Sequence, residues 1–223
     1  MTERRVDKRL LAPVLMGFFI MGFCDIVAPV TNIISGEFAE SQQSAVSFLP
    51  SMVFLWFLLL STPVAALMNR IGRKNTVLIS LIVTAASLFV PTLGDSYMVM
   101  LVAFSLLGIG NAIMQTSLNP LVTNLISGDK LASTLTFGQF VKAIASFLAP
   151  VIAAWGATTA FPTFGLGWRA LFVIYAVISF LSISLLAATP IDEERPDKAS
   201  GVGECLRLLG RPFIFLCFLG IMC

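Results

Sequence analysis

Six long apolar runs, separated by short polar connections, dominate this chain. Crossing a hydrocarbon core of about 30 Å takes about 20 apolar residues in a helix. Runs of this kind cover residues 10–34, 45–68, 76–93, 97–126, 131–155 and 168–188. Because unpaired backbone groups are very costly in lipid, each run is predicted to be a helix. The sequence therefore predicts an all-α membrane protein with six transmembrane helices.

The composition excludes an ordinary soluble domain. Of the 223 residues, 57% are hydrophobic and 12% are charged, and the mean hydropathy is +0.94. Soluble domains carry about 25% charged residues. The chain has no His, and its four Cys show no Cys-x-x-Cys spacing, so no metal site and no cofactor are expected. The expected surroundings are the lipid bilayer, and no nucleic-acid partner is expected.

Basic residues set the expected orientation. Twelve of the 14 Lys and Arg residues fall on one side of an alternating six-span arrangement. They are Arg4, Arg5, Lys8, Arg9, Arg70, Arg73, Lys74, Lys130, Arg195, Lys198, Arg207 and Arg211. Because short basic loops stay in the cytoplasm, we expect a multi-pass protein of the cell inner membrane with a cytoplasmic N-terminus. The loop with Glu37 and Glu40 is expected outside, and Trp168 and Arg169 are predicted to anchor the outer interface.

The chain changes character after residue 188. Residues 189–211 are charged and interrupted by proline, which is typical of a cytoplasmic linker. Residues 212–223 begin another apolar run, but they would reach only about 18 Å as a helix. We therefore interpret residues 1–188 as a six-helix bundle, residues 189–211 as a linker and residues 212–223 as the truncated start of a seventh helix.

Three amides recur inside the fourth run. Asn111, Gln115 and Asn119 are spaced i, i+4 and i+8, which places them on one face of a helix. Amides in membrane helices also join neighbouring helices, at about 0.6 kcal/mol each. Three in one row, followed by Pro120, favour the lining of a cavity, where the carbonyl freed by the proline can be hydrated.

Two ionisable residues lie deep within the runs. Asp25 belongs to the first run, and Lys142 shares a face of the fifth with Gln139 at i, i+3. A charge at mid-bilayer costs about 2.5 to 3.5 kcal/mol, so such groups usually face a cavity. We expect Asp25 and Lys142 to face one cavity and to pair directly or through water. The predicted substrate-binding residues are Asp25, Asn111, Gln115, Asn119, Gln139 and Lys142.

The loop between the second and third runs carries a recognisable motif. Residues 65–74 resemble the corresponding loop of the major facilitator superfamily, Gly-x-x-x-Asp-Arg-x-Gly-Arg-Arg/Lys, with Ala65 and Asn69 in place of the glycine and the aspartate. The resemblance implies a transporter built from two six-helix halves, of which this chain would be the amino-terminal one without its carboxy-terminal partner. A basic loop that only orients the protein is the competing interpretation.

The same loop supplies the predicted gating residues. Arg70, Gly72 and Arg73 are expected to act on conformational exchange rather than on substrate. The reason is depth, because the loop is expected to lie about half a membrane thickness from the amide row.

A narrower resemblance concerns the binding residues. The motifs Asp25-x-x-x-Pro29, Asn119-Pro120 and Gln139 are similar to those of the fucose permease type of sugar:proton symporters. This implies a sugar site at Asp25. The same family has a proton-coupling glutamate where this chain has Gln115, which cannot titrate, and commonly an asparagine where this chain has Lys142.

These observations predict a secondary transporter, not an enzyme. It would move a sugar or a similar polyhydroxylated solute by alternating access, as a uniporter or as a symporter with a proton or another ion. The alternative is a complete six-helix channel or interaction scaffold that acts as a dimer. The amide row alone fits both.

Overall fold

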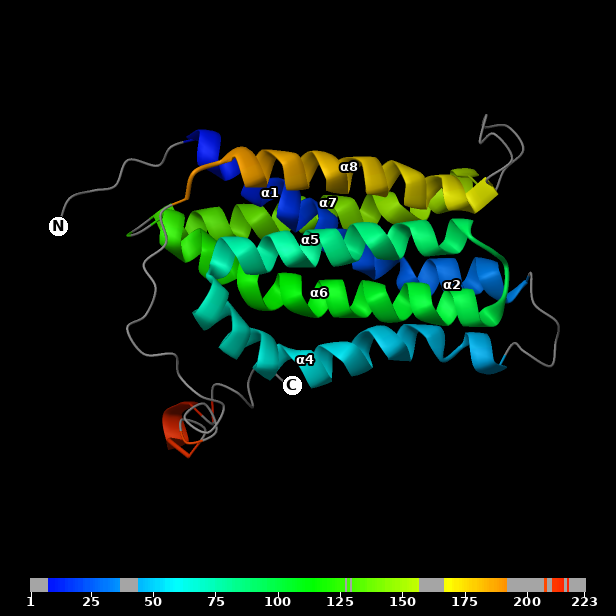
Figure 1. The fold of residues 1–223 in the computed structure, drawn as a ribbon, viewed down its shortest axis with the longest axis horizontal. Helices are drawn as coiled ribbons and strands as arrows, with labels where there is room; N and C mark the ends of the chain where they lie inside the picture. Colours follow the sequence, from blue (N-terminus) through cyan, green and yellow to red (C-terminus); the bar gives the residue numbers. More distant parts are fainter. Residues whose placement is uncertain are drawn as a thin grey trace.

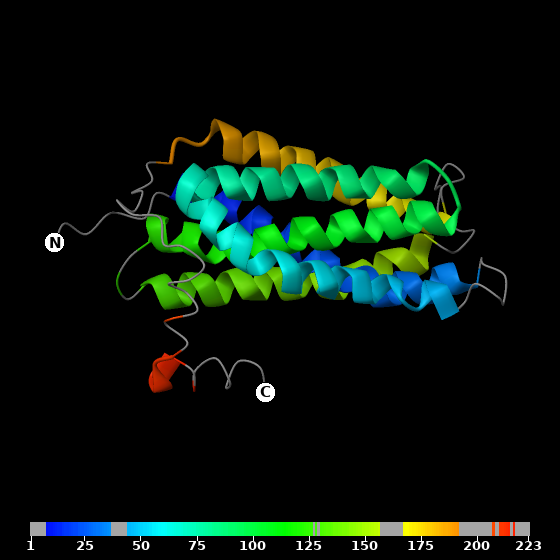
Figure 2. The ribbon, with the colours of Figure 1, turned by 60° about the horizontal axis from the view of Figure 1, so that its bottom comes forward.

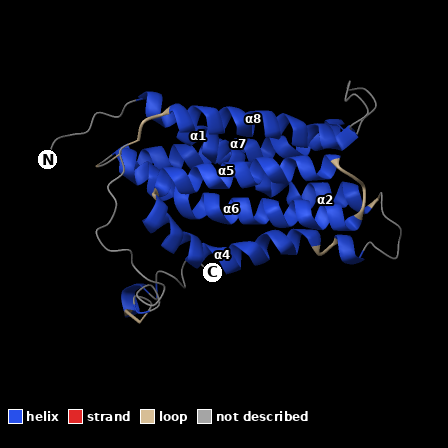
Figure 3. Ribbon diagram, in the orientation of Figure 1, coloured by secondary structure: helices blue, strands red, loops and turns tan. Residues whose placement is uncertain are grey.

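The computed structural model describes residues 8–36, 44–126, 128, 130–156, 167–191, 207, 210–214 and 216. The described residues form helices and connecting loops without a strand (Figure 3). The main helices are α1 (Lys8–Phe23), α2 (Val27–Ser35), α4 (Leu49–Ile71), α5 (Arg73–Phe89), α6 (Tyr97–Leu125), α7 (Lys130–Gly156) and α8 (Ala170–Ala188). Short 3₁₀ turns are η1 (Cys24–Ile26), η2 (Val90–Thr92) and η3 (Gly167–Arg169).

The six predicted spans are confirmed. Six helical segments are long and apolar enough to cross a membrane, and their bounds differ from the predicted ones by a few residues. They are Leu11–Ser35, Ser44–Ile71, Arg73–Thr92, Tyr97–Leu125, Lys130–Trp155 and Ala170–Ala188. The outer loop with Glu37 and Glu40, and most of the predicted linker and seventh helix, lie outside the described residues.

The helices run roughly side by side in one bundle (Figures 1 and 2). Helix α6 packs against α4 and α5, α5 also packs against α8, and α1 packs against α7. The α4–α5 and α6–α7 connections lie at the end of the bundle where α1 begins, which we call the inner end (Figure 1). The α5–α6 turn and the start of α8 lie at the opposite, outer end (Figure 1). This alternation places Arg70, Arg73 and Lys130 together at the inner end.

Local sequence explains the breaks between helices. Pro29 has no N–H to bond the carbonyl of Asp25, and the first span narrows to the 3₁₀ turn η1 around that residue. Ser96 starts α6, because its hydroxyl accepts a hydrogen bond from the Val99 N–H at 3.3 Å. Helices α4 and α5 are joined by Gly72 alone, whose φ of 93° and ψ of 159° are essentially restricted to glycine.

The buried core consists of two apolar clusters stacked along the helices. The outer cluster includes Phe104 and Tyr175, and the inner cluster includes Leu81 and Leu118. On α6 the outer cluster ends at Leu107 and the inner one begins at Met114. The segment of α6 between them contains Gly108, Gly110 and the buried Asn111.

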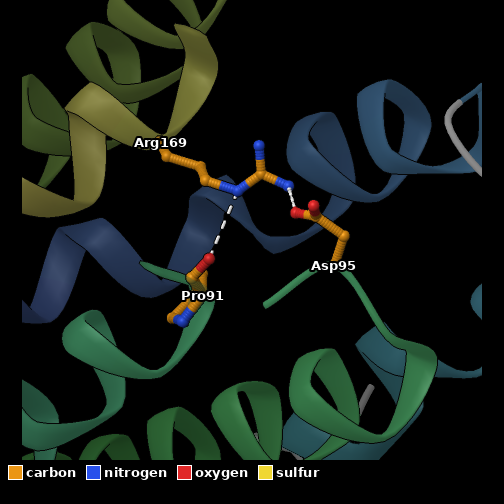
Figure 4. Close-up of polar contacts among 3 residues, drawn as sticks. All are labelled: Pro91, Asp95 and Arg169. Atoms are coloured by element: carbon orange, nitrogen blue, oxygen red, sulfur yellow. Dashed lines mark hydrogen bonds and ion pairs between the residues drawn. The ribbon is translucent and has the colours of Figure 1, made fainter. Parts of the chain in front are cut away.

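An arginine ties the outer end together (Figure 4). The Arg169 guanidinium forms an ion pair with Asp95, and its Nε donates to the Pro91 carbonyl at 3.2 Å. Arg169 therefore links the start of α8 to the α5–α6 connection. Its predicted role as an anchor at the bilayer interface stays a prediction. The ring of Trp168 lies outside the described side chains.

Candidate binding site

The site is built where α1 crosses α7. A Cβ on Gly22 would lie 2.3 Å from the Lys142 carbonyl oxygen, so only glycine allows this approach. The approach carries η1, with Asp25, against α7. A break in the helix thus presents a carboxylate beside the neighbouring backbone.

Ser146 holds that carboxylate. Its Oγ lies 2.5 Å from Asp25 Oδ2, 3.0 Å from the Lys142 carbonyl and 3.2 Å from the Gly22 carbonyl. A hydroxyl has one hydrogen to donate, and the carboxylate is the strongest of these acceptors. The Asp25 side chain nevertheless remains exposed. It therefore keeps acceptor capacity for a ligand.

Lys142 lies on the same face of α7 as Gln139 and Ser146, at spacings of i+3 and i+7 from Gln139. Its side chain is half-buried, and Gln139 is exposed. Asp25 and Lys142 lie in one region, because the Ser146 Oγ contacts both the Asp25 carboxylate and the Lys142 carbonyl. The prediction was that Asp25 and Lys142 pair directly or through water. A direct ion pair between them is not found among the described residues, and the carboxylate accepts a hydrogen bond from Ser146.

The α6 amides separate into a pair and a single residue. The Gln115 Nε2 donates to Asn111 Oδ1 at 3.2 Å, and Asn111 is only 8% exposed. Asn119 is exposed and lies two turns nearer the inner end. Because η1 packs against both α6 and α7, the helices that carry the predicted site residues meet at the break in the first span. A direct contact between the amides and Asp25 is not found among the described residues.

Arg73, one of the predicted gating residues, and its neighbour Lys74 join three helix ends. The Arg73 Nη1 donates to the Pro120 carbonyl at 3.1 Å and also contacts Asn124 Oδ1. The Lys74 Nζ donates to the Thr189 carbonyl at 2.7 Å. The loop therefore binds the residue next to Asn119. The expected separation of half a membrane was wrong for this end of the amide row, because α6 extends down to the loop.

Two residues beside Asp25 and Lys142, Ser146 and Tyr175, were not predicted from the sequence. Ser146 carries a signal, since it shares its helical face with Gln139 and Lys142. Tyr175 has no such signal in the sequence, because it is one of many buried positions on the apolar helix α8. It is buried, its ring centroid lies 4.1 Å from that of Phe23, and its hydroxyl lies 3.4 Å from the Ala145 carbonyl, directly behind the site.

Comparison with known proteins decides the family. The family model described as Major Facilitator Superfamily matches residues 14–223. This chain belongs to the major facilitator superfamily. The superfamily predicted from the basic loop is thereby confirmed, whereas the fucose permease type is not shown.

Sugar transporters are found among this superfamily member's relatives. Glucose/galactose transporters of two Brucella abortus strains, biovar 1 strain 9-941 and strain 2308, are each 31% identical over 145 residues. The match covers 61% of this chain and 34% of each relative. The chain thus spans about a third of the length of the curated relatives it matches. By family and by relatives it groups with transporters and not with enzymes.

A solved structure supports the superfamily fold. The proton:xylose symporter XylE, bound to 6-bromo-6-deoxy-D-glucose, matches with a TM-score of 0.67 and 16% sequence identity. The match covers 82% of this chain and 44% of that one. At this identity the likeness concerns the fold, and it confirms the all-α, six-helix prediction.

Proposed function

We propose that the protein containing this chain is a secondary transporter of a sugar or a similar polyhydroxylated solute, working by alternating access. The observation that carries the proposal is the Asp25 carboxylate, which is exposed at a break in the first span and oriented by Ser146. Carboxylates and amides suit sugars, because they match the donors and acceptors of adjacent hydroxyls. The relatives named as glucose/galactose transporters support this substrate class.

The coupling mode is a separate question from the substrate class. Gln115 is an amide, so it cannot carry a proton. A proton gradient distinguishes the two modes, because it should raise uptake by a proton symporter and leave uptake by a uniporter unchanged. The XylE neighbour, named as a proton symporter, gives a reason to test the first.

The test is sugar uptake by the longest reading frame that contains this chain, reconstituted in proteoliposomes. We expect saturable uptake and counterflow of labelled D-glucose, D-galactose or D-xylose, and loss of uptake in Asp25→Asn. Asp95→Asn is the matched control, because its carboxylate lies in the outer turn. Linear flux without counterflow would instead indicate a channel. An inward proton gradient that raises uptake would identify symport.

A further inference from the structure

Lys142 is too deep in its helix to reach water at either end. It lies 12 residues after Lys130 and 14 before Gly156, the ends of α7. At 1.5 Å per residue these spacings are about 18 Å and about 21 Å, which is longer than a lysine side chain. Its ammonium therefore needs an anion or polar partner inside the bundle.

Partners for this ammonium are scarce. Among the described residues the carboxylates are Asp25 and Asp95. Asp95 pairs with Arg169 at the outer end, and Asp25 accepts from Ser146. No hydrogen bond or ion pair of the Lys142 side chain is found in the described part of the chain. The ammonium is half-buried, so it remains accessible to a ligand.

The polar groups around Lys142 are hydrogen-bond donors on α7 and one acceptor, the Asp25 carboxylate. Gln139, Lys142 and Ser146 form a row on α7 that can supply amide, ammonium and hydroxyl donors. Asp25, facing the end of that row, is an acceptor. A neutral sugar would satisfy Asp25 through its hydroxyls but would bring no anion to Lys142. A sugar that also carries a carboxylate satisfies both, because a charge-assisted bond between an ammonium and a carboxylate is about twice as strong as a neutral hydrogen bond.

We propose that Lys142 binds an anionic group of the substrate, and that the preferred substrate is a sugar acid whose hydroxyls are bound by Asp25. The inference rests on the proposed function and narrows its substrate class. It assigns Lys142 to substrate recognition rather than to support of Asp25.

The test compares two sugars that differ at one carbon. Uptake of D-galacturonate and of D-galactose is measured with the full reading frame in proteoliposomes. We expect galacturonate to be preferred by about tenfold or more, as one charge-assisted contact allows. Lys142→Gln should lower galacturonate uptake about tenfold more than it lowers galactose uptake, whereas Lys142→Arg should retain the preference.

Each outcome decides a different point. Uptake of galactose without preference for galacturonate would overturn the inference and leave the proposed function standing. Equal losses for both sugars in Lys142→Gln would also overturn it, because the lysine would then serve the site as a whole. Failure to transport either sugar would overturn the inference, whereas the proposed function would be rejected only if D-glucose and D-xylose were not transported either. If Lys142→Gln does not fold, competition of the two unlabelled sugars against labelled galactose in the unmodified protein decides the question.

Discussion

The hydroxyl of Ser146 has three oxygens within reach and one hydrogen to share among them. Two are backbone carbonyls, of Gly22 and Lys142, and the third belongs to the Asp25 carboxylate. A carboxylate accepts several hydrogen bonds, so a ligand hydroxyl can donate to Asp25 while Ser146 still holds the carboxylate in place.

Replacing this serine should weaken binding. Ser146→Ala removes the donor that orients Asp25, and hydrogen bonds to charged groups contribute about 1.5 kcal/mol or more. We expect the affinity for sugar to fall about tenfold, measured by equilibrium binding to the purified protein. Ser133→Ala is the control, because Ser133 on the same helix bonds only its local Lys130 carbonyl. Equal affinity in the two variants would refute the role.

Charged residues of the site could be predicted from the sequence, because burying a charge in a membrane costs free energy. A serine in a helix has no such cost and gives no comparable signal. Asp25 and Lys142 were predicted as site residues because a charge inside a membrane needs a reason. Ser146 was missed because a serine in a helix can satisfy itself locally, as Ser184 does with the Phe180 carbonyl. Only the approach of α1 at Gly22 distinguishes one serine from the other.

The α4–α5 connection is the shortest of the connections between spans that the structure describes in full. Gly72 accepts hydrogen bonds from both the N–H and the hydroxyl of Thr76, and donates its own N–H to the Met68 carbonyl. Its backbone therefore belongs to both helix ends at once. The positive φ explains why the motif has glycine there.

Alanine at Gly72 should destabilise the fold. An L-residue in this conformation costs about 1 to 3 kcal/mol. We expect Gly72→Ala to lower the thermal unfolding temperature in detergent. Gly36→Ala is the control, because Gly36 has a φ of −72° and an exposed position. The same Tm for both variants would contradict this reading of the turn.

The arginine after this glycine should affect rate more than binding. Arg73 connects the start of α5 to the end of α6 through Pro120 and Asn124. Arg73→Ala should slow transport with little loss of equilibrium binding. Arg70→Ala should do less, because Arg70 is exposed and makes no hydrogen bond or ion pair within the described residues. A collapse of binding in a folded Arg73→Ala protein would disprove the gating role.

Helix positions were predictable from hydropathy, but the contacts between helix ends were not. The run from residue 97 to 126 matches α6 closely, since its apolar length alone requires a span. The bond from Arg73 to Pro120 joins residues 47 positions apart and depends on how α5 packs against α6. Periodicity within one helix contains no information on such packing.

In the whole molecule, the alternating direction of the spans gives the bundle two ends. The distribution of basic residues distinguishes one end from the other. The inner end holds the α4–α5 connection, with Arg70 and Arg73, and the start of α7, with Lys130 (Figure 1). At the outer end Arg169 pairs with Asp95 (Figure 4). A count of loops and charges sufficed to predict this, because each span must reverse the direction of the chain. How a second half would cover the exposed site residues could not be predicted from this chain.

The proposed orientation can be tested by labelling. Leu93 is 79% exposed at the outer end, and Lys130 is exposed at the inner end. In a background without the four native cysteines, Leu93→Cys should react with an impermeant thiol reagent added outside intact cells. Lys130→Cys should react only after permeabilisation. The reverse pattern would invert the topology.

The one-residue connection at Gly72 also has a mechanical consequence. Helix α4 is the least buried of the six spans, yet it has no slack at its inner end. Where α4 crosses α6, a Cβ on Gly108 would lie 2.7 Å from the Val53 Cα, so the two backbones are also in close contact there. Any tilt of α4 must pull on the start of α5, and through Arg73 on the end of α6. A movement of α4, the most exposed span, would thus be transmitted to α5 and α6 in the interior of the bundle.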